Sequence, residues 1–386
     1  MKNKQKKKSN GKWLQFLILV AVGAVSGLPF FRYLEHSTNE GLTGMGLILS
    51  YILTFVCLYL ALLVQIIVHE AGHLIFGLMT GYRFSSFRIL NLMWIKKDGK
   101  IMFKRMATLV NGGQCLMSPP DLIDGQMPVM LYNFGGVIMN AVTALLCLGF
   151  SLLFSSYSIA WLFTVFLAII GFAFALLNGI PFNLSTMNND GRNALDLSKN
   201  PETMRALWIQ LKVTELLSEG LRVKDMPDEW FVVPSDESMK NGLIATVGVL
   251  ACEHLMDKHQ FNEADMLINR LLTTENGVVG IQRNLLVCNR MYIELITNNR
   301  ADVLEKMRTK QQLKFMKAMR GIPSIIRTEY AYALLAEKDG LKTETLLWQF
   351  DNCALTYPYP SEIQSNMELI NIAYHVMQNR FDGGNV

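Results

Sequence analysis

MGLILSYILTFVCLYLALLVQIIVHEAGH, residues 45–73, decides the fold of this chain of 386 residues. Its first 24 residues, Met45 to Val68, carry no charge, and about 20 apolar residues let a helix cross the hydrocarbon of a bilayer. The last five, His69-Glu70-Ala71-Gly72-His73, place two histidines on one face of a helix with a glutamate beside the first. Such histidines can bind one zinc ion while the glutamate acts as general base. The stretch therefore predicts a zinc site on a membrane-spanning helix.

The alternative is a chance match, because a histidine on an apolar helix is usually a core residue. Ionisable side chains at a membrane span are costly, however, and are usually functional. Three of them within five residues at the end of one span favour the metal site.

The two halves of the chain differ in composition. Residues 1–196 contain 15 Lys and Arg against 8 Asp and Glu, a net charge of +7; residues 197–386 contain 21 against 24, a net charge of −3, and the two add up to +4. This difference predicts a membrane part followed by a soluble part. The cysteines form no CxxC pair and no short disulfide spacing, which indicates reduced thiols that are not zinc ligands: Cys57, Cys115, Cys147, Cys252, Cys288 and Cys353.

Four apolar runs in the first half are each long enough to span a membrane: Trp13–Phe31, Met45–Val68, Pro128–Phe154 and Ile159–Phe182. Lysine and arginine are concentrated in residues 1–12 and 82–126 and are absent from 35–44 and 155–158. The positive-inside rule then predicts a multi-pass protein of the cell membrane with both termini in the cytosol. His69 would lie near the cytosolic end of its span. A cleaved signal peptide is the alternative for the first run.

A catalytic zinc ion normally takes three protein ligands, so one more is needed. The first half offers only His36 besides the motif, on the predicted opposite side, and no glutamate lies between Glu70 and Glu202. The third ligand is therefore expected to be an aspartate. The candidates are Asp98, Asp121, Asp124, Asp190 and Asp196.

Between the second and third spans, Arg83–Ile95 and Ile101–Val110 are rich in Phe, Ile, Leu and Met, with Asp98-Gly99 between them. Asp-Gly flanked by such runs is a hairpin signal. A small cytosolic β-hairpin is therefore predicted within residues 82–117.

The second half is predicted to be an all-α cytosolic domain, because apolar residues recur at helical spacing. Candidate helical segments with a period near 40 suggest a tetratricopeptide-like stack: 239–273, 281–318, 323–356 and 361–380. Such a stack would dock a cytosolic protein partner or regulate the membrane part; alternatively it only stabilises that part. No nucleic-acid partner is predicted, and His254 and His259 are expected at the surface.

Two further elements accompany HEAGH. The third run contains Gly135-Gly136-Val-Ile-Met-Asn140, and Asn178-Gly-Ile-Pro181 leads from the fourth run to Asp190-Gly191. Together, over residues 45–192, they resemble the site-2 protease family of intramembrane zinc metalloproteases, peptidase family M50.

The resemblance implies Zn²⁺ as cofactor and a membrane-spanning protein or peptide as substrate. It implies that His69, His73 and Asp190 bind the metal, that Glu70 is the catalytic base, and that Asn140 donates to the oxyanion or to substrate backbone. It also implies a substrate-binding role for five residues: Gly112, Gly113 and Gln114, which are similar to a strand thought to pair with unwound substrate, and Asn178 and Pro181.

The chain departs from the family pattern in two places. Eight residues separate Pro181 from Asp190, more than is usual, and Gly136 stands where the family has a proline. Asp196 is therefore kept as a reserve ligand. The segment around Asp190-Gly191 can also be a plain turn, since Asn and Asp before Gly suit one.

These observations predict a mainly α fold: about four membrane spans with a β-hairpin insert, followed by an all-α domain. The expected domains are a basic N-terminus with the first span (1–44), a zinc protease core (45–192) and a cytosolic helical domain (197–386). The expected function is zinc-dependent intramembrane proteolysis. The alternative is an inactive scaffold that binds membrane peptides and recruits partners, but a scaffold would not need Glu70.

Overall fold

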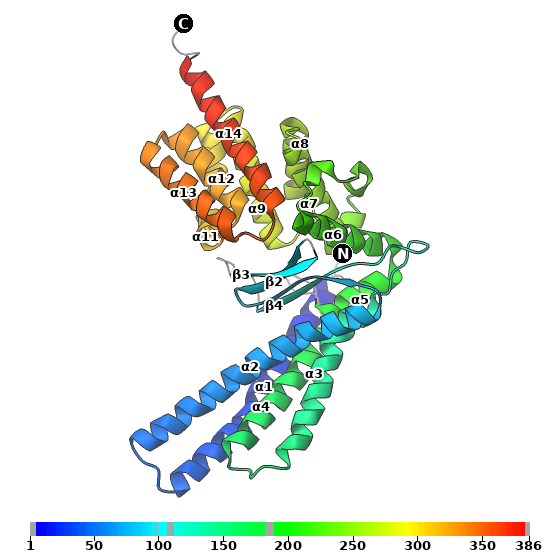
Figure 1. Cartoon of the computed structure of the whole chain (residues 1–386), viewed down its shortest axis with the longest axis vertical. Coiled ribbons are helices and arrows are strands. Elements are labelled where there is room, and N and C mark those ends of the chain that lie inside the picture. The colour runs from blue at the N-terminus through cyan, green and yellow to red at the C-terminus, as the bar shows by residue number, and fades with distance from the viewer. Residues whose placement is uncertain (1–4, 98, 106–111, 182–188, 383–386) are drawn as a thin grey trace. The chain divides into compact units, whose positions relative to one another are not determined.

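The computed structural model describes residues 5–97, 99–105, 112–181 and 189–382. The chain is mostly helical, 73%, with one small antiparallel sheet (Figure 1). The strands are β1 (Arg83–Ile89), β2 (Leu92–Lys97), β3 (Lys100–Arg105) and β4 (Gly113–Ser118). The longer helices are α1 (Gln5–Asn39), α2 (Met45–Met79), α3 (Met130–Ser151), α4 (Ile159–Gly179), α5 (Asp190–Lys199), α6 (Pro201–Glu219), α7 (Gly242–Asp257), α8 (Phe261–Thr273), α9 (Gly280–Ile296), α10 (Ala301–Met307), α11 (Lys310–Ala318), α12 (Pro323–Tyr332), α13 (Gly340–Thr356) and α14 (Pro360–Asp382).

The chain forms two compact units. We call Met1–Phe84 together with Gly112–Pro201 the membrane unit, and Ser85–Asn111 together with Glu202–Val386 the helical unit.

Four helices of the membrane unit are long and apolar enough to cross a membrane: α1, α2, α3 and α4. They correspond to the four predicted runs, and the prediction of four candidate spans is confirmed. A helix pairs its backbone N–H and C=O groups internally, and this is needed in a membrane because hydrocarbon offers no hydrogen-bond partners. Helices α2, α3 and α4 pack against one another, and α4 is the most buried of the four.

Helices α2 and α3 touch through their backbones. A Cβ atom on Gly72 would lie 2.3 Å from the carbonyl oxygen of Gly135, and one on Gly135 would lie 2.5 Å from the carbonyl oxygen of Gly72. Both values are far inside van der Waals contact. Only glycine at these two positions allows this approach, which brings α3 against the HEAGH turn of α2.

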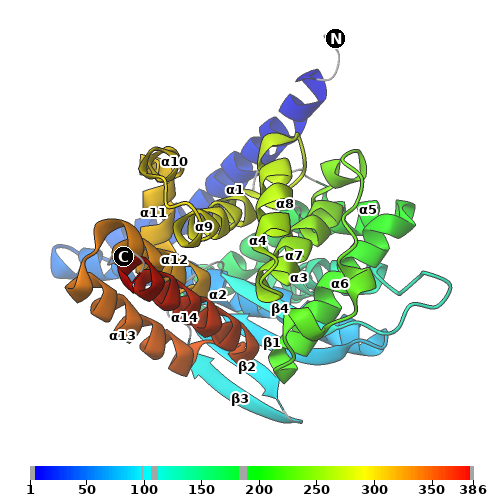
Figure 2. The same ribbon diagram turned by 90° about the horizontal axis from the view of Figure 1, so that it is seen from above.

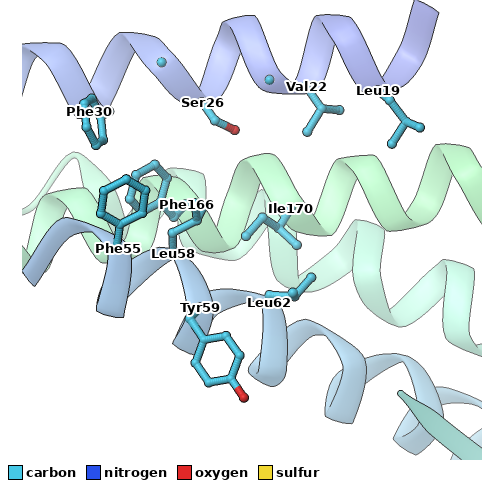
Figure 3. A pocket seen from close by; sticks show the side chains of 12 residues that line it. Leu19, Val22, Ser26, Phe30, Phe55, Leu58, Tyr59, Leu62, Phe166 and Ile170 are labelled. Atoms are coloured by element: carbon cyan, nitrogen blue, oxygen red, sulfur yellow. The ribbon is translucent and has the colours of Figure 1, made fainter. Parts of the chain in front are cut away.

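Helix α1 packs less closely and lines an apolar pocket. The pocket has a volume of about 770 Å³ and lies between α1, α2 and α4. Figure 3 shows Phe30 from α1 facing Phe55 and Leu58 from α2 and Phe166 from α4. Only 6% of the apolar part of α1 is buried, so α1 contributes little to the packed interior.

The strands are arranged in the order β3-β2-β1-β4. The predicted hairpin is found as the pair β2–β3, from Leu92↔Arg105 to Lys97↔Lys100. The first predicted strand, 83–95, is instead two antiparallel strands, because the chain reverses after Ile89 through Leu90, whose φ is 52°. Residues 106–110 of the second predicted strand lie outside the described residues.

The helical unit has one continuous hydrophobic core, to which α7, α9, α12 and α14 contribute. Figures 1 and 2 show α9, α12 and α14 side by side, and all three contact one another. Residues 85–111 belong to this unit: Lys104 Nζ in β3 donates to the Tyr357 carbonyl at 2.8 Å.

The expectation that His254 lies at the surface is wrong, because it is 5% exposed and bonds the Val223 carbonyl and Asp228.

Candidate metal centre

Helix α2 continues through HEAGH and ends at Met79. The motif therefore lies within the helix, as predicted, and its two histidines share a face. The Nε2 atoms of His69 and His73 are 3.2 Å apart. His69 is 8% exposed, so this face of α2 is covered by protein.

Asp190 is the first residue of α5 and not part of a plain turn. The preceding residue, Asn189, is the N-cap and accepts from the Arg192 amide at 3.1 Å. Its side-chain nitrogen donates to the carbonyls of Leu177 and Ile180 at 2.7 and 2.6 Å. Asn189 thereby fixes the start of α5 to the end of α4, which aims Asp190 at α2.

The structure brings His69, His73 and Asp190 together. Asp190 Oδ2 lies 3.1 Å from His69 Nε2 and 3.5 Å from His73 Nε2. Among the described residues they form the one cluster of three such side chains whose potential ligand atoms all lie within 4.8 Å of one another. Burial would raise the pKa of the Asp190 carboxyl, but hydrogen bonding and positive charge from the two imidazoles, when these are protonated, lower it below its ordinary value.

The hydrogen bonds behind the histidines indicate where their protons are. His73 Nδ1 lies 2.8 Å from the Tyr132 carbonyl, which can only accept, so Nδ1 of His73 carries the hydrogen. His69 Nδ1 faces Asn140 Oδ1 at 2.7 Å. When each ring is neutral and carries its hydrogen on Nδ1, its Nε2 atom has a free lone pair, and both Nε2 lone pairs face Asp190 Oδ2. This Oδ2 atom is buried and has no hydrogen-bond partner in the structure. Three converging lone pairs, two from nitrogen and one from oxygen, fit a zinc ion.

The other aspartates do not join this cluster. The reserve ligand Asp196 forms an ion pair with Arg192, with Oδ2 3.0 Å from Nε. Asp121 and Asp124 are not in the cluster, and Asp98 lies outside the described residues. The geometry therefore favours Asp190 among the four candidates that the structure describes.

Glu70 lies against the start of β4. The Cys115 backbone N–H donates to its carboxylate. A Cβ atom on Gly113 would lie 2.7 Å from Glu70 Cγ, so a larger residue would displace the carboxylate. The predicted substrate strand therefore begins beside the predicted base.

Asn140 is fully buried, with both ends of its amide engaged. Its oxygen faces His69, and its nitrogen donates to the backbone carbonyl and the side-chain oxygen of Gln65 at 3.0 and 2.7 Å. The predicted donation to the oxyanion or to substrate backbone stays a prediction; in this structure both amide hydrogens are directed at Gln65. Asn140 lies behind a metal-site histidine.

The remaining predicted substrate residues stay predictions. Asn178 donates to its own helix, at the Phe174 carbonyl, with a separation of 3.1 Å. Pro181 is exposed just beyond α4, Gly112 is exposed, and Gln114 is half-buried in β4. None of them belongs to the described cluster.

Sequence reasoning missed Gln65 and Tyr132. A glutamine in a membrane span is a usable signal, because an amide must find partners there. Tyr132 acts through its backbone carbonyl, for which no side-chain pattern exists.

Comparison with known families gives one match. The model described as peptidase family M50 matches residues 57–331, which is more than half of the chain and includes the whole cluster. No curated protein and no solved structure matches.

Proposed function

Because the chain belongs to peptidase family M50, the site-2 protease family, we propose that it is a zinc-dependent protease that cuts a membrane-embedded protein or peptide. The observation that carries the proposal is the convergence of three lone pairs from His69, His73 and Asp190 next to a carboxylate, Glu70. A scaffold that only binds peptides would need neither the cluster nor the base.

His69, His73 and Asp190 would hold the ion. When bound, zinc supplies a Lewis acid that makes water more acidic and polarises a carbonyl group. Glu70 would take a proton from the attacking water and deliver it to the leaving nitrogen. The Cys115 amide would keep the Glu70 carboxylate in place between these two transfers.

We propose that the substrate lies along β4. A helical peptide shields its carbonyl carbons within its own hydrogen-bond ladder, so a segment must be extended before cleavage. β4 is an edge strand of the sheet, and an edge can pair with an added strand. Gly112, Gly113 and Gln114 would hold the substrate close to Glu70.

We further propose that the protein lies in the cell membrane with both termini in the cytosol, as the lysine and arginine distribution predicts. The domain division at 1–44, 45–192 and 197–386 is part of this proposal. The helical unit would bind a cytosolic protein partner or regulate cleavage. The tetratricopeptide-like repeat is not confirmed and stays a prediction.

The test replaces the base and keeps the metal ligands. Glu70→Gln should leave the protein folded and zinc-bound while cleavage falls by about 10²–10⁴-fold, the usual contribution of a general base. Membrane fractions from cells with wild-type and Glu70→Gln protein, compared by quantitative proteomics, would reveal fragments that depend on Glu70. Glu35→Gln, the same change at an exposed position of α1, is the matched control. Equal cleavage by Glu70→Gln and wild type would rule out the proposed mechanism.

A further inference from the structure

We propose that Gln65 is a positioning residue for the metal site: acting through Asn140, it fixes the His69 ring so that Nε2 presents its lone pair to the metal. The inference rests on the proposed zinc site. It assigns a task to the one amide side chain in the span before HEAGH.

A chain of buried hydrogen bonds joins three helices. Gln65 Nε2 in α2 donates to the Leu167 carbonyl in α4 at 2.8 Å. Gln65 Oε1 accepts from Asn140 Nδ2 in α3 at 2.7 Å, and Asn140 Oδ1 faces His69 Nδ1 at 2.7 Å. Gln65 is 1% exposed and Asn140 is 0% exposed, so water does not compete for these bonds.

The direction of every bond follows from groups that can only accept. The Leu167 carbonyl requires the nitrogen end of the Gln65 amide, so the oxygen end faces α3. This side-chain oxygen and the backbone carbonyl oxygen of Gln65, which lies 3.0 Å from Asn140 Nδ2, can only accept. Both therefore require the nitrogen end of the Asn140 amide. The Asn140 oxygen must then face His69, whose Nδ1 carries the hydrogen and whose Nε2 does not.

Gly171 in α4 supplies an independent observation. A Cβ atom there would lie 2.8 Å from Gln65 Nε2, and also 2.9 Å from Ala144 Cβ and 3.0 Å from the Asn140 backbone carbonyl oxygen, both in α3. The glycine therefore leaves room for the Gln65 amide and for the close approach of α3 to α4.

Without Gln65, Asn140 keeps only the backbone carbonyl of residue 65 as acceptor, and its amide is held less firmly. His69 can then rotate or place its hydrogen on Nε2, where it opposes metal binding. Partners of this kind typically change metal affinity or activity by about 10–100-fold.

The experiment measures zinc affinity of the full-length protein in detergent by competition with a chelator. Gln65→Met removes the amide at similar length, and Gly171→Ala leaves Gln65 intact but crowds both its amide and α3. Both substitutions should lower zinc affinity by about tenfold or more, and Asn140→Leu should lower it further. The visible spectrum of the cobalt-substituted protein should change in the same variants, which a loss of general stability would not produce.

Two controls match these changes. Thr54→Val removes a buried polar group of α2 that bonds only the Ser50 carbonyl of its own helix. Gly149→Ala adds a methyl group in α3 with nothing within 4 Å. Both should bind zinc like the wild type.

Folded Gln65→Met with a zinc affinity within about twofold of wild type, below the usual range for such partners, would overturn the inference. If Gln65→Met does not fold, the same result for Gly171→Ala would overturn it. Wild-type protein that fails to bind zinc would instead refute the proposed function itself.

Discussion

At the scale of single residues, Asp190 decides whether the site can hold a metal. It is the carboxylate that the structure places within 3.5 Å of both histidines of HEAGH. We expect Asp190→Asn to lower zinc affinity by at least about 100-fold, beyond the 10–100-fold effect of a lost hydrogen-bond partner. Asp196→Asn should keep its zinc, because Asp196 pairs with Arg192. Metal analysis of the purified proteins measures both, and unchanged zinc in Asp190→Asn would exclude it as a ligand.

The motif residues could be predicted because their spacing is local. His69, Glu70 and His73 lie within one helical turn, and the scarcity of other histidines and glutamates reduced the third ligand to five aspartates. The residues around them could not be predicted so well. Gln65 and Asn140 are 75 positions apart, and only the packing of α2 against α3 makes them partners.

At the scale of elements, β4 passes so close to Glu70 that it can hold the Glu70 carboxylate in place. Gly113→Ala would place a methyl group 2.7 Å from Glu70 Cγ and push the carboxylate away from its Cys115 contact. We expect zinc content to stay the same and the turnover number to fall by about tenfold or more, because general bases act only when well placed.

Gly149→Ala is the matched control for that substitution, because Gly149 lies in α3 outside the proposed site. Its added methyl group would meet nothing within 4 Å. Near wild-type turnover is expected. Equal turnover in both alanine variants would mean that the position of Glu70 does not depend on β4.

Helix α14 of the helical unit carries a carboxylate with an altered acidity. Burial raises the pKa of Glu362 to about 7 from an ordinary 4.5, although the Tyr357 hydroxyl, which donates to it at 2.7 Å, acts in the opposite direction. The folded unit then binds a proton between pH 4.5 and 7 that the unfolded chain releases, so this group lowers stability as pH rises.

We therefore expect Glu362→Gln to stabilise the helical unit at pH 8 by an amount on the order of 3 kcal/mol. The gain should disappear below about pH 4.5. Unfolding curves of the full chain at several pH values measure this, with the exposed Glu344→Gln as control. A gain that is independent of pH would contradict the assignment.

Elements were predictable where length and hydropathy suffice. A run of about 20 apolar residues has few alternatives to a membrane-spanning helix, and all four runs became helices. The sheet was harder, because Leu90 reverses the chain with a positive φ that β-branched and bulky residues rarely adopt. Nothing in its sequence marks it as a turn.

At the scale of the whole molecule, the chain has two units with separate cores. Zinc would stabilise only the unit that contains its ligands, by about 2.7 kcal/mol when free zinc exceeds the dissociation constant 100-fold. Chelation should therefore speed hydrogen exchange in peptides of α2, α3 and α5 and leave α7–α14 unchanged. Mass spectrometry resolves these peptides, and equal loss of protection in both units would show that their stabilities are coupled.

The assignment of residues 85–111 to the helical unit had no signal in the sequence. The segments directly before and after them in the sequence belong to the membrane unit. The contact from Lys104 reaches Tyr357, 253 positions away. Pairings over such distances are set by tertiary packing and leave no periodicity to detect.

The backbone contact between Gly72 and Gly135 has a consequence for anyone who would graft this site onto another scaffold. The five-residue motif does more than supply metal ligands: its fourth residue, Gly72, also allows the neighbouring helix to approach closely. A designed apolar helix carrying His-Glu-x-x-His with a bulky fourth residue would hold its neighbour too far away for an Asn140 equivalent to reach the first histidine. The transplant must therefore include the glycine on both helices.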